Sequence, residues 1–194
     1  MQAVGYSLDV LREGRAEKIV AFAADELYAQ QMAGYDKIGN LYSGVEEADF
    51  RLRFGDPFKT VYGEGACALV LETRAAAERR GAQTYGSVLS FASYEEPGEF
   101  DGANLGDAGL RIAAERSLSR AGVGAGEIGL VVWSPRGDAQ DGKVLRLRRE
   151  LFPGAGIVTN VFNTGYVESA SAISALAEVL YCLKNGMGLW RQKT

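Results

Sequence analysis

Residues 63–72 (GEGACALVLE) and the residues that follow them, 73–81 (TRAAAERRG), decide the fold class of this chain of 194 residues. Residues 67–71 form a continuous apolar run next to turn-forming glycines, which is typical of a buried strand. Thr73 is a favourable helix N-cap and Gly81 a favourable stop, so a helix is predicted between them. A buried strand followed closely by a helix favours an α/β architecture.

The two glycines at the start of this stretch do not form a known nucleotide-binding motif. Gly63 and Gly65 precede a strand and not a helix, so they form neither a dinucleotide-binding fingerprint nor a phosphate-binding loop. Taken alone, they predict a tight turn in which the backbone adopts positive φ angles.

Outward from this unit, apolar runs alternate with helical patterns. Further strands are expected at 19–24, 84–92, 128–133 and 157–162, and further helices around 4–14, 28–35, 107–121, 143–151 and 168–184. Two polar or glycine-rich stretches, 43–60 and 94–106, are expected to be loops. This alternation indicates a sheet with parallel or mixed pairing. It places polar loops after the fourth and fifth strands, where open α/β sheets bind ligands.

The composition excludes several classes of function. The chain has no histidine, which rules out a Ser-His-Asp triad, a Cys-His pair and histidine-ligated zinc within these residues. Its formal net charge of −4 does not suggest a nucleic-acid partner. Cys67 and Cys182 form no CxxC motif and indicate a reducing compartment. No apolar run is long enough to span a membrane, and the first residues lack the pattern of a signal peptide, so a cytoplasmic location is expected.

Four segments together resemble the elongating β-ketoacyl synthases: 56–58 (DPF), 63–72, 75–82 (AAAERRGA) and 85–89 (YGSVL). Weaker similarity to the same family covers 3–22, 106–132 and 157–186, so the resemblance extends over nearly the whole chain. It implies a thiolase-like fold, layered α-β-α-β-α and incomplete at both ends. Residues 1–82 would be the remainder of the first half of that fold, and residues 83–194 most of the second.

The resemblance also implies a chemistry. Members of this family carry out decarboxylative Claisen condensation, in which a cysteine thiolate takes the acyl group and two histidines stabilise the developing oxyanions. In this chain the nucleophile would precede Met1, and Cys67 lies within a strand with no activating group beside it. The positions of the two histidines correspond to Ser134 and Tyr166. Phe162 takes the position of the family's lysine, whereas Glu64 keeps its acidic residue.

Two interpretations of the strand-end loops remain open. Ser134, Asp138, Asn163 and Tyr166, with Glu64 and Phe162 nearby, either line a remodelled pocket for a phosphopantetheine-linked acyl group or fill polar loops that bind nothing. Asp138, Glu64 and Glu168 also form a candidate carboxylate site. No metal site and no cofactor of the chain itself is indicated.

Three functional hypotheses follow. The first is a catalytically silent ketosynthase-like subunit of fatty acid or polyketide biosynthesis, similar to a chain-length factor, that acts beside an active synthase. The second is a non-enzymatic interaction module, or a synthase half that needs a complementary chain carrying the nucleophilic cysteine. The third is an enzyme of altered chemistry using Tyr166 or Asp138. The expected partners are a ketosynthase subunit or a second copy of the chain, with an acyl carrier protein possible, and neither nucleic acid nor a membrane.

Overall fold

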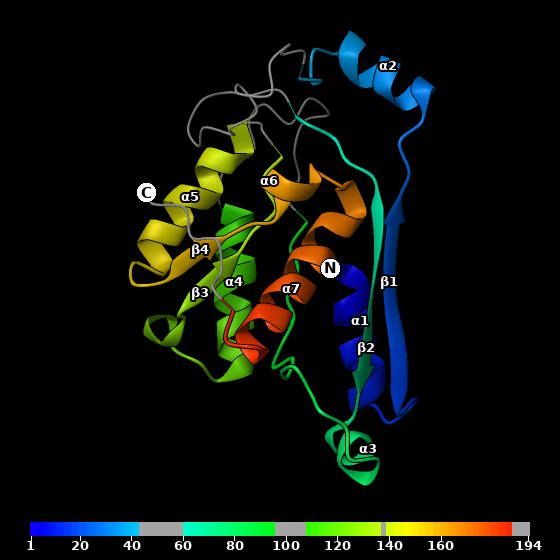
Figure 1. Ribbon diagram of the computed structural model, residues 1–194. Coiled ribbons are helices and arrows are strands. Elements are labelled where there is room, and N and C mark those ends of the chain that lie inside the picture. Colours follow the sequence, from blue (N-terminus) through cyan, green and yellow to red (C-terminus); the bar gives the residue numbers. More distant parts are fainter. Residues whose placement is uncertain (43–59, 96–107, 137–138, 188–194) are drawn as a thin grey trace.

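The computed structural model describes residues 1–42, 60–95, 108–136 and 139–187 (Figure 1). Its helices and strands alternate along much of the chain. In chain order they are α1 Gln2–Arg12, β1 Lys18–Asp25, α2 Ala29–Lys37, β2 Gly65–Glu72, α3 Arg74–Arg79, α4 Ala108–Ala121, β3 Leu130–Val132, α5 Ala139–Leu151, β4 Gly156–Val158, α6 Val161–Thr164 and α7 Glu168–Lys184. A short 3₁₀ turn, Ala125–Glu127, precedes β3. The mixture of helices and strands is the α/β architecture expected from the sequence.

Strands β1 and β2 form a two-stranded antiparallel sheet in which every residue of each strand is paired, from Lys18 with Glu72 to Asp25 with Gly65. Successive side chains in a strand point to opposite faces. One face therefore carries the odd-numbered residues and the other the even-numbered ones. Figure 1 shows α1 and α7 lying on the same side of this sheet.

The main core lies between the odd-numbered face and these two helices. Val4 of α1, Ala21 of β1 and Ile173 of α7 are each at most 2% exposed, and they contact one another. Partly buried side chains from both strands surround them: Ala23, Cys67, Leu69 and Leu71. Residues almost 170 positions apart thus share one core, because α7 returns to cover the sheet that the first part of the chain forms.

The even-numbered face of the same sheet is apolar and exposed. Val20 and its cross-strand partner Val70 are each 63% exposed, and Phe22 is 60% exposed opposite Ala68. Ala24 and Ala66 continue this face. We call these six residues the open face; it is defined by Val20, Phe22, Ala24, Ala66, Ala68 and Val70.

Strands β3 and β4 pair in parallel, with Leu130, Val131 and Val132 opposite Gly156, Ile157 and Val158. One more hydrogen bond extends the pair, because the Trp133 amide donates to the Val158 carbonyl at 3.0 Å. The apolar residues Ile157 and Val158 are buried, and α7 contacts β3. Among the described residues, the antiparallel β1–β2 pair and this parallel pair form two separate sheets, not the one sheet with parallel or mixed pairing expected from the sequence.

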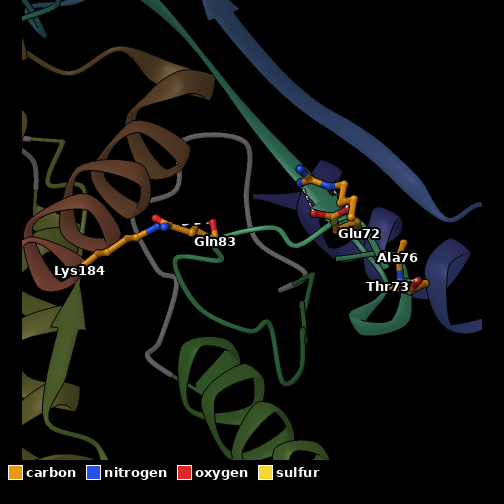
Figure 2. A network of polar contacts seen from close by, with 6 residues as sticks. Glu72, Thr73, Ala76, Gln83 and Lys184 are labelled. Atoms are coloured by element: carbon orange, nitrogen blue, oxygen red, sulfur yellow. Dashed lines mark hydrogen bonds and ion pairs between the residues drawn. The ribbon is translucent and has the colours of Figure 1, made fainter. Parts of the chain in front are cut away.

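The start of α3 agrees with the cap predicted from the sequence. The Thr73 hydroxyl accepts a hydrogen bond from the Ala76 amide at 3.2 Å, as Figure 2 shows, and Gly81 after the helix has a φ of +64°. The chain then turns toward the end of α7, where the Lys184 ammonium group donates to the Gln83 carbonyl at 3.4 Å (Figure 2). Lys184 also lies 4.0 Å from the centre of the Tyr85 ring, which adds a cation–π contact.

The strand expected at 84–92 is absent: these residues form no ladder in the described structure. Their apolar pattern predicts a strand, but arginine side chains bind two of the backbone carbonyls instead. The Arg12 guanidinium donates to the Leu89 carbonyl at 2.6 Å, and the Arg120 guanidinium donates to the Phe91 carbonyl at 2.8 Å. Arginines from α1 and α4 thus replace a neighbouring strand for these two groups.

Three other expectations need correction. The helix expected at 143–151 begins four residues earlier, at Ala139. The strand expected at 157–162 is only Gly156–Val158, because residues from Val161 onward form the short helix α6. Gly63 and Gly65 do not have positive φ angles. Gly63 is needed for a different reason: a Cβ atom there would collide with the backbone carbonyl of Thr164.

Most of the expected loops, 43–60 and 94–106, lies outside the described residues. In the part of the chain that the structure covers, no helix is both long enough and apolar enough to cross a membrane.

Candidate functional site

The two loops that sequence comparison matched to the family's histidines lie against each other. Arg136 follows Ser134 by two residues, and its guanidinium carbon lies 5.9 Å from the centre of the Tyr166 ring. At this distance a cation is attracted by the electron-rich face of an aromatic ring. The structure therefore brings the loop after β3 and the loop after α6 together, as the α/β pattern predicted.

A third segment, which leads into β2, holds Tyr166 in place through its backbone. The Tyr166 amide donates to the Val61 carbonyl at 2.8 Å, and the Gly63 amide donates to the Tyr166 carbonyl at 3.1 Å. These bonds form a parallel bridge between Tyr62 and Tyr166. This close approach is the reason that no side chain fits at Gly63.

Three tyrosine side chains, Tyr35, Tyr62 and Tyr166, form what we call the tyrosine cluster. The rings of Tyr35 and Tyr62 are stacked, with centroids 4.2 Å apart and an angle of 2° between the planes. The Tyr62 and Tyr166 rings meet edge to face, with centroids 6.1 Å apart. Both arrangements suit the ring quadrupole. The cluster thus joins α2, the segment before β2 and the loop before α7.

Glu168, the first residue of α7, anchors the cluster electrostatically. The Tyr35 hydroxyl donates to the Glu168 carboxylate, and the Gln31 amide group donates to the Tyr35 hydroxyl at 3.1 Å. The bond to the carboxylate, helped by burial, raises the pKa of Tyr35 to about 12. Glu168 also has a φ of +25°, which is rare for a residue with a side chain.

Polar groups around Tyr62 complete the arrangement. The Asn40 side-chain amide donates to the Tyr62 hydroxyl at 2.8 Å, and the Thr60 hydroxyl donates to the Arg136 carbonyl. Burial is the main cause that raises the pKa of Tyr62. Thr60 itself is only 2% exposed, so it ties the loop after β3 to the segment before β2. Tyr35 and Tyr62 are therefore neutral phenols at physiological pH and do not act as bases.

The site residues expected from the sequence have different outcomes. Tyr166 is a member of the tyrosine cluster. Ser134 lies two residues after the end of β3, and its hydroxyl is buried without a hydrogen-bond partner among the described residues. Glu64 is exposed at the start of β2, where its carboxylate accepts a hydrogen bond from the Leu27 amide at 3.2 Å.

For the other expected site residues, the structure gives only the position of the backbone or nothing. Phe162 and Asn163 lie in α6, where a strand end and a turn were expected. Asp138 lies outside the described residues. The role of each of these residues stays a prediction. Of the candidate carboxylate site, Glu168 binds Tyr35 and Glu64 binds a backbone amide of another segment, so the contacts of these two differ.

Sequence reasoning missed most residues that build the site. The helical spacing of Tyr28, Met32 and Tyr35 predicted a helix and no more, and nothing in the sequence linked Tyr35 to Glu168, 133 positions away. Tyr62 stands one residue before the glycine stretch that identified the fold, yet its partners come from two distant segments: Tyr35 and Asn40 from one, and Tyr166 from the other. Only the tertiary structure could reveal these contacts.

Within the described ranges, no three histidine, cysteine or carboxylate residues lie close enough to hold a metal ion. The site therefore offers neutral phenols, a guanidinium group and a carboxylate already bound to a phenol.

Comparisons with known proteins agree with this architecture. No family model matches the chain. Among curated proteins, the polyketide synthase ThaG of Burkholderia thailandensis is 33% identical over 197 aligned positions, which cover 91% of this chain and 3% of that protein. The ketoacyl synthase alpha subunit of the tetracenomycin polyketide synthase of Streptomyces glaucescens is 34% identical over 96 positions, 48% of this chain and 22% of the subunit.

The chain is related to part of a β-ketoacyl synthase. Its fold is that of the same family, since the ishigamide ketosynthase/chain length factor superimposes with a TM-score of 0.76 at 22% identity. That match covers 94% of this chain and 45% of the solved one. The ketosynthase-related chain thus has a thiolase-like α/β fold. It spans about a fifth of the tetracenomycin subunit and less than half of the solved chain.

Proposed function

We propose that this chain serves polyketide assembly as a ketosynthase-like component that does not itself carry out condensation, similar to a chain-length factor. The observation that carries the proposal is the content of the two loops that match the family's histidines. They hold Ser134 and Tyr166, and Tyr166 belongs to a packed tyrosine cluster.

The physical argument concerns the charge that develops during condensation. Decarboxylation and attack on a thioester both place negative charge on oxygen, and an enzyme needs donors aimed at that oxygen. A serine hydroxyl and a tyrosine in contact with Arg136 supply hydrogen-bond donors at most. The two cysteines of the described residues, Cys67 and Cys182, lie inside β2 and near the C-terminal end of α7, not at a helix N-terminus that would activate a thiolate. This set of residues supports binding or assembly better than catalysis.

A partner is part of the proposal. The open face exposes Val20, Phe22 and Val70 in one contiguous apolar strip, which a ketosynthase subunit carrying the nucleophilic cysteine, or a second copy of the chain, would cover. An acyl carrier protein would deliver the phosphopantetheine-linked acyl group. We further propose a cytoplasmic location, and a division at residues 82 and 83 into parts of the two thiolase-like halves. Service in fatty acid synthesis is the less favoured variant, because the relatives compared above are polyketide synthases.

The experiment is a condensation assay with the purified chain, malonyl-loaded carrier protein and an acyl donor. The chain alone is expected to give neither condensation nor carbon dioxide release, and addition of a cysteine-containing ketosynthase subunit is expected to give both. The matched control is the same partner with its cysteine replaced by alanine. Condensation or decarboxylation by the chain alone would overturn the proposal.

A second candidate function is that of a synthase half completed by another chain, and the open face favours it because a lone sheet seldom leaves so much apolar surface exposed. Its test is the state of the isolated chain in dilute solution. The proposal expects self-association or a broad, low-temperature unfolding transition that a complementary chain sharpens. A strictly monomeric species that unfolds in one sharp transition would count against it.

A further inference from the structure

Two buried polar atoms at the carboxyl ends of β3 and β4 have no hydrogen-bond partner among the described residues. One is the side-chain oxygen Oδ1 of Asn160, a residue that is only 5% exposed, and the other is the hydroxyl oxygen of Ser134. Most buried polar groups in proteins are paired, so two unpaired groups in neighbouring segments need an explanation.

The strand register places the two residues at the same edge of the sheet. Val132 and Val158 are the last paired residues of β3 and β4. Ser134 and Asn160 each lie two residues further along their own segment. Because the strands are parallel, both residues follow the sheet at the same edge, its carboxyl end.

A chain of hydrogen bonds fixes which atom of Asn160 is unpaired. The Ser174 hydroxyl donates to the Ser171 carbonyl at 2.9 Å, so its oxygen can only accept from Asn160. The Asn160 amide nitrogen supplies that bond, with 3.1 Å between Nδ2 and the Ser174 Oγ. Its oxygen Oδ1 is therefore the free group, and it is an acceptor.

The Asn160 side chain does not cap the helix that it precedes. Asparagine is among the best helix N-caps, and Asn160 is the N-cap residue of α6, but its side chain makes no capping bond there. It is turned toward α7 instead. The neighbours along the chain are apolar and buried: Trp133 is 9% exposed, Val158 5% and Val161 3%. An unpaired acceptor in such surroundings is costly.

We propose that Ser134 and Asn160 form a binding subsite for an uncharged group that both donates and accepts a hydrogen bond. The N–H of a primary carboxamide, or the O–H of an alcohol, would donate to Asn160 Oδ1. The carbonyl or hydroxyl oxygen of the same group would accept from the Ser134 hydroxyl. The subsite shares Ser134 with the loops on which the proposed function rests. Its existence requires neither a carrier protein nor condensation.

The test uses three probes of almost equal size and shape. Butyramide and 2-pentanol each carry a donor, whereas 2-pentanone keeps the chain and lacks one. The chain has two tryptophans, Trp133 and Trp190, so the Trp190→Phe variant leaves Trp133, next to Ser134, as the fluorescent reporter. A donor hydrogen bond of ordinary strength should make at least one donor probe bind about fivefold more tightly than 2-pentanone. The donor probe that shows this preference identifies an amide or an alcohol as the ligand class.

A second measurement reports on Asn160 itself. In nitrogen-15 NMR spectra of the unaltered protein, the donor probe should shift the side-chain amide signals of Asn160, and 2-pentanone should not. Equal effects of all three probes, or no effect of any, would overturn the proposal. So would one ordered water that bridges the two residues and that no probe displaces, because the pair would then serve internal hydration.

Two serine variants distinguish a hydroxyl that binds a ligand from one that is only buried. Ser134→Ala should weaken the binding of butyramide and 2-pentanone alike, by about fivefold, because the oxygen of each accepts from the Ser134 hydroxyl. Ser90→Ala, which removes a serine hydroxyl bonded to Ser117, should leave both affinities unchanged. If Ser134→Ala instead raises the melting temperature and leaves both affinities unchanged, the hydroxyl is only an unsatisfied buried group and the subsite does not exist.

Discussion

The two described sheets of this chain differ in what covers them. The β1–β2 sheet is antiparallel, eight residues long in each strand, and packs one face on α1 and α7 while the other face stays open. The β3–β4 sheet is parallel and only three residues long, and its carboxyl ends lead into loops with polar and aromatic side chains.

This difference suits the two sheets to different roles. The long sheet supplies a core and an apolar surface suited to another protein. The short sheet supplies the ends of strands, where α/β proteins place ligand-binding groups. The two residues predicted to stand at the family's histidine positions, Ser134 and Tyr166, lie in loops near the end of the short sheet, whereas residues 63–72, which carry the strongest resemblance, lead into and form β2 of the long sheet.

The largest expected effect comes from the covered face of the long sheet. Ile173→Ala should lower the free energy of unfolding by about 3 kcal/mol, because Ile173 is 1% exposed and contacts Val4 and Ala21. Urea unfolding followed by circular dichroism measures it. The matched control is Val20→Ala on the open face, expected to cost less than about 0.5 kcal/mol. Equal losses would show that both faces are buried.

The open face itself is probed by Phe22→Glu. A carboxylate in a 60%-exposed position should leave the stability of the isolated chain nearly unchanged, but it would be desolvated against an apolar partner. We expect at least a tenfold loss of affinity for the ketosynthase partner, measured by calorimetry. Leu183→Glu, at another exposed apolar position on α7, should have no such effect. Unchanged binding by the Phe22 variant would remove the open face from the interface.

A smaller effect is expected where the long sheet leads into α3. Thr73→Ala removes the hydroxyl that accepts from the Ala76 amide and should cost about 1 kcal/mol. Thr73→Ser, which keeps the hydroxyl, is the control. The comparison by thermal unfolding tests whether the cap predicted from the sequence contributes in the folded chain. A loss of the same size in both variants would argue against it.

The smallest expected change in stability concerns the hydrogen bond from Tyr35 of α2 to Glu168, the first residue of α7. This bond links the tyrosine cluster to the helix that covers the long sheet. The folded protein raises the pKa of Tyr35 from 10 to about 12, so it favours the protonated phenol. The stabilisation is complete below pH 10 and is lost as the pH rises from 10 to 12. The stability difference between the wild type and Tyr35→Phe should therefore shrink over that interval. A difference that stays constant would show that the hydroxyl is not held by the carboxylate.

The sequence predicted correctly those elements whose formation depends on residues close together along the chain. It predicted β1, β2, α3 with its Thr73 cap and α7, since apolar runs, capping residues and helical spacing act locally. It was wrong about residues 84–92, because an apolar extended segment becomes a strand only when another strand accepts its hydrogen bonds. Here Arg12 and Arg120 bind two of its carbonyl groups instead.

By itself, the sequence determined the α/β class, the family resemblance and the absence of histidine from the chain. The tertiary structure alone decided that Tyr166 joins Tyr35 and Tyr62 and that Gly63 is needed for close approach and not for a turn. It also decided that Asn160 and Ser134, which follow neighbouring strands, each bury an oxygen without a partner among the described residues. The physical reason is distance along the chain. A cap or a strand is fixed by residues a few positions apart, whereas these contacts join segments up to 133 residues apart that only the folded core brings together.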